Sequence, residues 1–403
     1  MPQLNLLYLS FWGLQDGLTT STILPHLRIL QTFENIKSIT VCTIERDGHQ
    51  PDIPSGYDDK VNFIPLLKKR YKSTYLSKMT EFTELPKAIH KICIQKGINH
   101  ILARGVNAGG IALNVHKKSN IPFTVESFEP HSDYMLESNA WKRYGLKYLF
   151  GNKWERDQQK MCKHIITVSE NYRKRLIVEG VPIEKIFTIP CCVDLDRFNH
   201  SEISRKKVRE KLGIADTTMV AVYVGKFGDI YYDKEAFSII KCAFDYFGKD
   251  FYFIILSPQA KENIRLALEE KGIPASNFYI DCVPHEVIPE FLSAADFAIS
   301  FVKPANCRKY CSPIKDGEYW AAGLPILMTE NIGDDSDIVK TNPKSGYVFS
   351  PDFTDIIVGF KHVEQILQSN FRHEIVAVNR EIARKYREFS IAEDVYKAIF
   401  NQH

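Results

Sequence analysis

Short apolar runs alternate with longer amphipathic stretches along the whole chain, and they do so in two series. Such runs, separated by helical stretches, are typical of parallel strands buried on both faces. Each series therefore predicts one open, doubly wound α/β domain. The runs of the first series are Leu4–Ser10, Ile39–Ile44, Ile101–Ala103, Phe123–Val125 and Ile165–Val168, and those of the second are Met219–Val224, Phe251–Leu256, Phe278–Ile280, Phe297–Phe301 and Ile326–Met328.

A chain of 403 residues is too long for one ordinary core, which agrees with two domains. The two series are separated near Ile189–Asp194, so we expect domains over residues 1–193 and 194–385. Asn379–Phe400 predicts a helical end with a break near Phe389 and Ser390.

Composition narrows the functional class. The net charge of +3 is too weak to indicate a nucleic-acid partner. The nine cysteines contain no CxxC pair, so we expect reduced thiols, no zinc site and a cytoplasmic protein. No run approaches the roughly 18 apolar residues of a membrane span, and the apolar start predicts a buried strand and no signal peptide.

The segment Cys311–Ile326 is the most informative for chemistry. Ser312 is expected to cap a helix that has Pro313 at its first position and ends before Gly323, with a buried strand following. A helix N-terminus offers N–H groups to an anion, and Lys315 adds a charge there. Glu318 lies one turn further on the same face, where it could chelate a ribose diol or merely pair with Lys315.

The pattern Ser-Pro-x-Lys-x-x-Glu-Tyr-x-Ala-Ala-Gly-x-Pro in this segment resembles the donor-site helix of the retaining glycosyltransferases of family 4, also called glycosyl transferases group 1. Four further segments are similar to elements of that family in the same order. They are Val168–Glu170, Ile189–Phe198, Tyr223–Lys226 and Pro284–Asp296. The likeness covers roughly residues 100–403 and is weaker before them.

The resemblance implies a GT-B fold, with two Rossmann-like domains facing a central cleft and a final helix, at about 386–403, packing back on the first domain. It implies a retaining hexosyl transfer from a nucleoside diphosphate sugar to a glycan or lipid-linked acceptor, in cell-surface polysaccharide or glycoconjugate synthesis. No cofactor or metal is expected. The implied donor-binding residues are Gly225, Lys226, Pro284, Ser312, Lys315 and Glu318.

Two departures leave other functions open. The family has a first glutamate about seven residues before the second, but Tyr310 and Cys311 stand at that place here. The family also has a histidine after the fourth or fifth strand of the first domain, where this chain has Phe128. A nucleotide-sugar epimerase with the same architecture and a non-catalytic binding subunit are therefore the alternatives.

The first domain is expected to bind the acceptor. Gly13 and Gly17 flank a loop after the first strand, where backbone N–H groups can approach phosphate. Glu129 and His131, followed by Glu126, are the candidates for serving the acceptor hydroxyl, because they crowd the loop after Pro122–Val125. Each of them could equally be a polar residue that stabilises the loop.

Acid triplets and basic-aromatic stretches are two further patterns in the sequence. The acid triplets Asp194–Asp196 and Asp335–Asp337 could bind a divalent ion, but their positions favour a linker turn and a helix start. Basic and aromatic residues interleave in Lys68–Lys72 and Trp141–Tyr148. Such stretches are either solvated helix faces or contacts with an anionic membrane, which would place the protein peripherally on the cytoplasmic membrane face.

Overall fold

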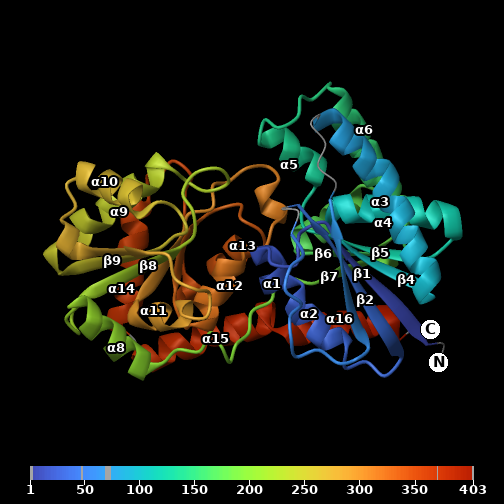
Figure 1. The fold of residues 1–403 in the computed structure, drawn as a ribbon. Helices are drawn as coiled ribbons and strands as arrows, with labels where there is room; N and C mark the ends of the chain where they lie inside the picture. Colours follow the sequence, from blue (N-terminus) through green and yellow to red (C-terminus); the bar gives the residue numbers. More distant parts are fainter. Residues whose placement is uncertain (1–2, 47–48, 69–73, 370, 402–403) are drawn as a thin grey trace. The chain divides into compact units, whose positions relative to one another are not determined.

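The structure is a computed structural model that describes residues 3–46, 49–68, 74–369 and 371–401, with backbone only for 74–82. The chain divides into two compact units: Met1–Pro190 with Ser390–His403, and Cys191–Phe389. The division between Pro190 and Cys191 lies inside the segment that separates the two apolar series. Each unit is a parallel sheet with helices, as the sequence predicts (Figure 1).

The sheet of the first unit has the order β3-β2-β1-β4-β5-β6-β7. Its strands are β1 (Leu4–Ser10), β2 (Ile36–Glu45), β3 (Val61–Leu67), β4 (His100–Arg104), β5 (Phe123–Ser127), β6 (His164–Thr167) and β7 (Ile186–Thr188). Its helices are α1 (Gly17–Thr22), α2 (Leu24–Leu30), α3 (Thr74–Lys96), α4 (Gly105–Ser119), α5 (His131–Glu137), α6 (Leu146–Met161), α7 (Glu170–Val178), the short η1 (Ile183–Lys185) and α16 (Phe389–Phe400), which joins this unit from Ser390.

The sheet of the second unit has the order β10-β9-β8-β11-β12-β13. Its strands are β8 (Met219–Val224), β9 (Phe251–Leu256), β10 (Phe278–Asp281), β11 (Phe297–Ser300), β12 (Ile326–Thr329) and β13 (Gly346–Phe349). Its helices are α8 (Glu202–Leu212), α9 (Lys234–Phe247), α10 (Lys261–Glu270), α11 (Ile288–Ala294), α12 (Ile314–Ala321), α13 (Asp335–Thr341), α14 (Ile356–Ser369) and α15 (Arg372–Arg387), with the short η2 (Gly248–Asp250), η3 (Ala275–Asn277), η4 (Arg308–Tyr310) and η5 (Pro343–Ser345).

Alternating side chains of the second sheet build two apolar cores, one on each face. Val220 and Val222 of β8 pack in the cluster that holds Tyr319 and Trp320 of α12. Ala221 and Tyr223 of the same strand pack in the cluster of α9, α10 and α14. Because both faces are covered, the central strands are apolar throughout, which is why the sequence revealed them.

Two predicted helices differ in how closely their ends match the structure. Gly323 has the left-handed φ of +80° expected where α12 stops. The expected start was wrong: α12 begins at Ile314, Pro313 is its N-cap, and no side chain caps it. The chain end breaks between α15 and α16 as predicted, at Glu388.

Candidate functional site

The second unit carries a polar group of residues at the point where its strand order reverses. β8 lies between β9, which follows it in the chain, and β11, which comes later. In open parallel sheets, ligands bind beyond the carboxyl ends of the strands at such a switch point, because the connecting loops diverge there. Gly225 and Lys226 follow directly after β8 and therefore lie at this point.

Gly225 lets the backbone approach the first turn of α12. Its φ is +148°, and a Cβ added to it would overlap Lys315 Nζ and come within 2.9 Å of Tyr223 Oη. Its N–H donates to the Leu256 carbonyl at 2.9 Å, and the Tyr223 hydroxyl donates to the Lys226 carbonyl, so the turn is held from both sides. A side chain here would displace the lysine amine, so the position favours glycine.

Lys315 is a buried cation surrounded by aromatic rings. Its Nζ lies 4.6 Å from the ring centroid of Tyr223 and 4.0 Å from that of Tyr231. Within the described part of the chain, no carboxylate forms an ion pair with it. Burial lowers the pKa of Lys315 to about 8. An incompletely compensated cation in a site of low dielectric attracts an anion strongly.

Glu318 lies one turn along the buried face of α12 and is held by a histidine. Its Oε1 is 2.7 Å from Nε2 of His285, and Nη2 of Arg197 lies 2.9 Å from Nδ1 of the same ring. Arginine can only donate, so Nδ1 must accept and Nε2–H donates to Glu318. The histidine is thus fixed as a neutral tautomer, and the second oxygen of Glu318 retains acceptor capacity for a diol.

The other predicted donor residues are placed around this core. Lys226 is exposed, and Pro284 is exposed in the loop that also carries His285. Ser312 does not cap α12; its Oγ accepts the Cys191 N–H at 3.0 Å and is also bonded by Arg387. The hydroxyl of Ser312 therefore joins the start of this unit to the start of α12, and the expectation that it caps the helix is wrong.

Three residues outside the predicted set complete the arrangement. Tyr223 and Tyr231 form the aromatic walls around Lys315, and His285 orients Glu318. His285 could have been found, because it follows Pro284 in a segment that the sequence singled out. Tyr223 could have been found in the same way, because it begins the segment Tyr223–Lys226. Tyr231 carried no signal, since an aromatic residue in a loop is usually a packing residue.

In the first unit, the loop after β1 lies at the corresponding switch point between β1 and β4. An acidic side chain occupies it: Glu45 Oε1 accepts the Leu14 N–H at 3.0 Å, and a Cβ added to Gly13 would come within 2.6 Å of Glu45 Oε2. Around Gly17, by contrast, there is open space for a side chain. The Leu14 N–H, which could otherwise bind phosphate, is thus already hydrogen-bonded to Glu45.

Glu126 is the centre of a buried hydrogen-bond cluster in the first unit. Its Oε2 accepts from Arg104 at 2.8 Å and from Tyr8 at 2.9 Å, and its Oε1 accepts from Tyr396 at 2.8 Å. Burial alone would raise the pKa of Glu126, but the Arg104 guanidinium holds it below its usual value. Its exposed fraction is 2%. This environment favours a stabilising role for Glu126.

Glu129 and His131 lie beyond this cluster, at the start of α5. Glu129 is half-buried, and His131 is the first residue of the helix. Burial lowers the pKa of His131, which keeps the imidazole neutral at pH 7 and able to accept a proton. Its ring centroid lies 5.8 Å from that of Trp141.

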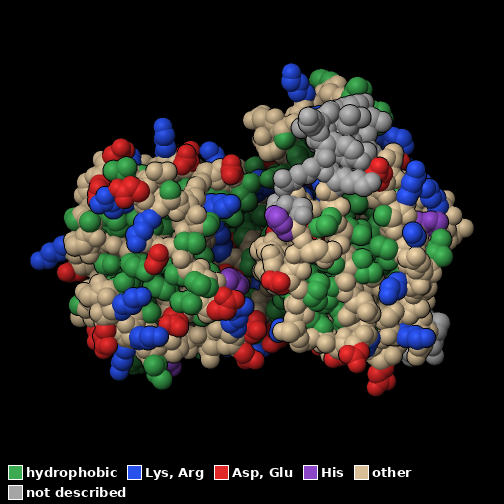
Figure 2. Space-filling view, in the orientation of Figure 1, with side chains coloured by type: hydrophobic (Ala, Val, Ile, Leu, Met, Phe, Trp, Pro, Cys, Tyr) green, Lys and Arg blue, Asp and Glu red, His purple; other side chains and the backbone are tan. Residues whose placement is uncertain are grey.

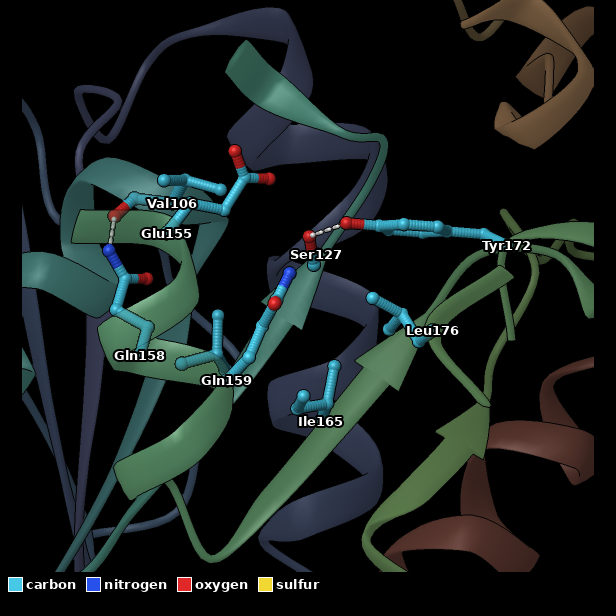
Figure 3. A pocket seen from close by; sticks show the side chains of 9 residues that line it. Val106, Ser127, Glu155, Gln158, Gln159, Ile165, Tyr172 and Leu176 are labelled. Carbon is cyan, nitrogen blue, oxygen red and sulfur yellow. Dashed lines mark hydrogen bonds between the residues drawn. The ribbon is translucent and has the colours of Figure 1, made fainter. Parts of the chain in front are cut away.

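A small cavity in the same unit is lined by residues of α4, α6, α7, β5 and β6 (Figure 3). Its volume of about 10 Å³ is close to that needed for one water molecule. Glu155 lines it and accepts the backbone N–H groups of His131 and Ser132 at 3.0 and 3.1 Å. Among the described residues, Gln158 Oε1 has no hydrogen-bond partner. The cavity is too small for a sugar and suits a structural water.

The acid triplets have structural surroundings. Asp194 Oδ1 accepts the N–H groups of Asp196 and Arg197, which is a turn. Asp335 forms an ion pair with Arg387. Among the described side chains, no group of three or more His, Cys, Asp or Glu residues is arranged to hold a metal ion. Of the basic stretches, Trp141–Tyr148 is described, whereas most of Lys68–Lys72 lies outside the described residues.

Over its whole length, the chain resembles known proteins in structure and not detectably in sequence. No family model and no curated protein sequence matches the chain. Solved structures do match. Sucrose-phosphate synthase from Thermosynechococcus elongatus superposes with a TM-score of 0.75 at 14% identity, over 99% of this chain and 98% of that one. Anabaena HepE in complex with UDP gives a TM-score of 0.70 at 13% identity, over 99% and 100%.

The chain has the GT-B fold. WaaG, a glycosyltransferase involved in lipopolysaccharide biosynthesis, shares it as well, with a TM-score of 0.69 at 15% identity over 98% of this chain and 99% of that one. The match extends over both units, including the first hundred residues where the sequence resemblance was weak. Among the described helices, none has both the length and the apolar character needed to cross a membrane.

Proposed function

We propose that this protein is a retaining glycosyltransferase that moves a hexosyl group from a nucleoside diphosphate sugar to a glycan or lipid-linked acceptor, in the synthesis of a cell-surface polysaccharide or glycoconjugate. It would act in the cytoplasm. The observation that carries the proposal is the buried Lys315, which lies at the switch point of the second sheet beside Gly225 and one turn from Glu318.

In this reaction the bond between the anomeric carbon and the diphosphate oxygen breaks. The acceptor oxygen bonds to the same face of that carbon, and its proton passes to the departing diphosphate or to a protein base. Lys315 and Lys226 would stabilise the negative charge that develops on the leaving group. Glu318 would hold the ribose. These two lysines supply the positive charge for which other transferases use a metal ion, so neither a metal nor another cofactor is required.

The test begins with a panel of nucleotide sugars. Uridine diphosphate sugars come first, because one HepE structure was determined with UDP-glucose. A true donor at about 100 times its dissociation constant should stabilise the protein by about 2.7 kcal/mol in thermal unfolding. Release of nucleoside diphosphate is then measured with and without acceptor, in EDTA. Turnover of the sugar without acceptor would indicate an epimerase, binding without turnover a binding subunit, and activity only with added magnesium or manganese a metal-dependent enzyme.

Glu318→Ala tests the donor site. The variant should bind donor about 10- to 100-fold more weakly, the effect of losing hydrogen bonds to a charged group. Stability should change little, because water can reach the half-exposed His285 that loses its acceptor. Glu270→Ala, an exposed change on α10, is the matched control. Donor affinity equal to that of the control would refute the role of Glu318.

Glu129 and His131 remain the preferred groups for the acceptor proton. Glu129→Gln and His131→Ala should reduce turnover while donor affinity stays the same, because the donor residues belong to the other unit. Glu126→Gln should instead lower stability, since its carboxylate is bonded to three partners. If all three variants keep full turnover, the acceptor site is not in this segment.

A further inference from the structure

The loop before α6 and the first two turns of that helix form an exposed surface of mixed apolar and basic character. We define it by six residues, Lys142, Arg143, Lys147, Tyr144, Leu149 and Phe150, and call it the α6 patch. Tyr144 is 87% exposed, Phe150 68% and Leu149 52%, and Leu146 beside them is 72% exposed. Large apolar side chains gathered at this exposure indicate a contact surface.

The apolar side chains in the first turns of α6 lie on its exposed face, and polar side chains lie on its buried face. This is the reverse of the usual arrangement in a helix that packs on its own domain. Leu146, Leu149, Phe150 and Lys153 recur at helical spacing and are all exposed. The opposite face carries the buried Glu155 and Gln158. Trp154 lies so close to α4 that a Cβ on Gly110 would overlap its ring. The inner face therefore holds α6 on its unit, and the apolar outer face has no packing role among the described residues.

The loop that precedes α6 is ordered and adds to the same surface. The Trp141 N–H donates to the Met135 carbonyl at 2.9 Å, and the Gly145 N–H donates to the Lys142 carbonyl at 2.8 Å. The Trp141 ring lies against Gly151 of α6, where a Cβ would overlap it. Lys142, Arg143 and Tyr144 are thus presented by a fixed loop beside the helix face.

Charge on this surface has one sign. Residues 138–154 contain Lys142, Arg143, Lys147 and Lys153 and no Asp or Glu, in a chain whose basic and acidic residues nearly balance at 52 and 49. Lys153 pairs with Asp157 at 3.0 Å, but within the described chain Lys142, Arg143 and Lys147 form no ion pair with an acid. The surface therefore suits an anionic partner.

We propose that the α6 patch docks on an anionic lipid bilayer, with Leu149, Phe150 and Tyr144 entering the headgroup region and the three basic residues contacting lipid phosphates. Basic and aromatic side chains around exposed aliphatic ones are the composition of a helix that lies in the membrane interface. A second copy of the same surface would bring like charges together, which disfavours a dimer through it. Figure 1 shows α5 and α6 at one end of their unit, and in Figure 2 basic and hydrophobic side chains lie side by side at that end, apart from the area covered by grey atoms.

This proposal does not depend on the proposed enzymatic activity, because its test measures binding alone. The full-length protein is mixed with vesicles of equal parts phosphatidylglycerol and phosphatidylcholine, or of phosphatidylcholine only, and the bound fraction is measured by flotation at low and high salt. The protein should float with the anionic vesicles at low salt, and high salt should release much of it, because each basic residue near an anionic surface contributes roughly fivefold in affinity.

Two variants locate the surface. The apolar variant carries Leu149→Gln and Phe150→Gln, and the basic variant carries Lys142→Gln, Arg143→Gln and Lys147→Gln. Each variant should lower the partition coefficient by about tenfold or more. The matched controls are Val178→Gln with Ile203→Gln, which are 88% and 83% exposed elsewhere, and Lys271→Gln with Lys344→Gln and Lys361→Gln. The controls should bind like the original protein.

Three results would overturn the proposal: no binding to anionic vesicles, equal binding to neutral vesicles, or equal losses in patch and control variants. Sedimentation of the protein without vesicles tests whether a second copy of the chain covers the patch instead. A dimer that the Leu149 and Phe150 substitutions dissociate would show that a second copy covers the patch. Because all substituted residues are exposed, unchanged melting of every variant is expected and is checked first.

Discussion

Lys315 combines burial with the absence of a carboxylate at ion-pair distance, among the residues described. Most buried lysines are paired, because an uncompensated charge in low dielectric is costly. Here the negative faces of Tyr223 and Tyr231 supply part of the compensation. Under the proposed function, a bound diphosphate would stabilise the charged lysine, and the pKa of Lys315 should rise when that anion binds.

This coupling predicts a pH dependence of donor binding. With a pKa of about 8 in the free protein, Lys315 loses its proton as pH rises above that value, so affinity for a nucleoside diphosphate should fall by up to about tenfold per pH unit there. Isothermal titration in buffers of different ionisation enthalpy should show proton uptake on binding. Lys315→Arg, which stays charged, should bind without that pH dependence. An identical profile in both proteins would contradict the prediction.

α12 is the element on which the second unit and its site depend together. Every residue from Lys315 to Ala321 is buried. One face packs Tyr319 and Trp320 into the core, and the Tyr319 hydroxyl accepts the Val224 N–H at 2.8 Å. Its N-terminus is joined through Ser312 to Arg387, which also pairs with Asp335. The eight residues of α12 therefore include both core residues and residues of the candidate site.

Asp316 in α12 gives a prediction at this scale. Its side chain is fully buried, and neither oxygen has a hydrogen-bond partner among the described residues. Burial raises the pKa of Asp316. Burial also raises the pKa of the neighbouring Asp335. The two carboxyl groups thus retain a proton in the folded protein that the unfolded chain releases near pH 4, so their contribution to stability is largest in acid and is lost as pH rises.

Asp316→Asn should weaken that dependence. Compared with the original protein, its free energy of unfolding should increase progressively with pH, by on the order of 1 kcal/mol at pH 8. Urea unfolding at several pH values measures it. Asp337→Asn, an exposed change on the neighbouring α13, is the control and should show no such trend. A constant difference across pH for Asp316→Asn would count against the prediction.

At the scale of the whole molecule, the last helix closes the first unit. Tyr396 of α16 donates to Glu126 and accepts from His26 Nδ1 at 2.8 Å, and the Asn35 side chain donates to the Phe400 carbonyl at 2.8 Å. Residues from the beginning, middle and end of the sequence therefore meet in one buried cluster. During synthesis, the residues of the second unit must therefore be made before the first unit can gain these contacts.

Tyr396→Phe should lower stability by about 1–3 kcal/mol, the cost of leaving a buried acceptor short of a donor. Hydrogen-exchange mass spectrometry should show faster exchange in β5 and α16 and unchanged exchange in β8–β13. The control is Tyr246→Phe, which removes a similar bond from tyrosine to Glu364 on a less buried surface and should cost less than about 1 kcal/mol. Faster exchange in β8–β13 as well would show that the cluster is not confined to its unit.

The sequence alone determined the class of fold and the central strands. β1, β8 and β9 have the predicted bounds, because a strand covered on both faces must be apolar at nearly every position. It missed β3, β7 and β13, which are all edge strands. β3 contains Pro65 and is mostly half-buried, so its composition lacks the signal that burial imposes on a central strand.

At the candidate site, helical spacing predicted that Lys315 and Glu318 share a face of one helix, and the family resemblance pointed to Gly225. The structure brings Gly225 against Lys315 at the switch point of the second sheet. Only the tertiary structure decided the partners of the polar groups. Glu126, a candidate base by position, is bonded to Tyr8, Arg104 and Tyr396, and Ser312, a candidate cap, is bonded to Arg387. These partners lie far from them in sequence, so no local pattern could specify the contacts.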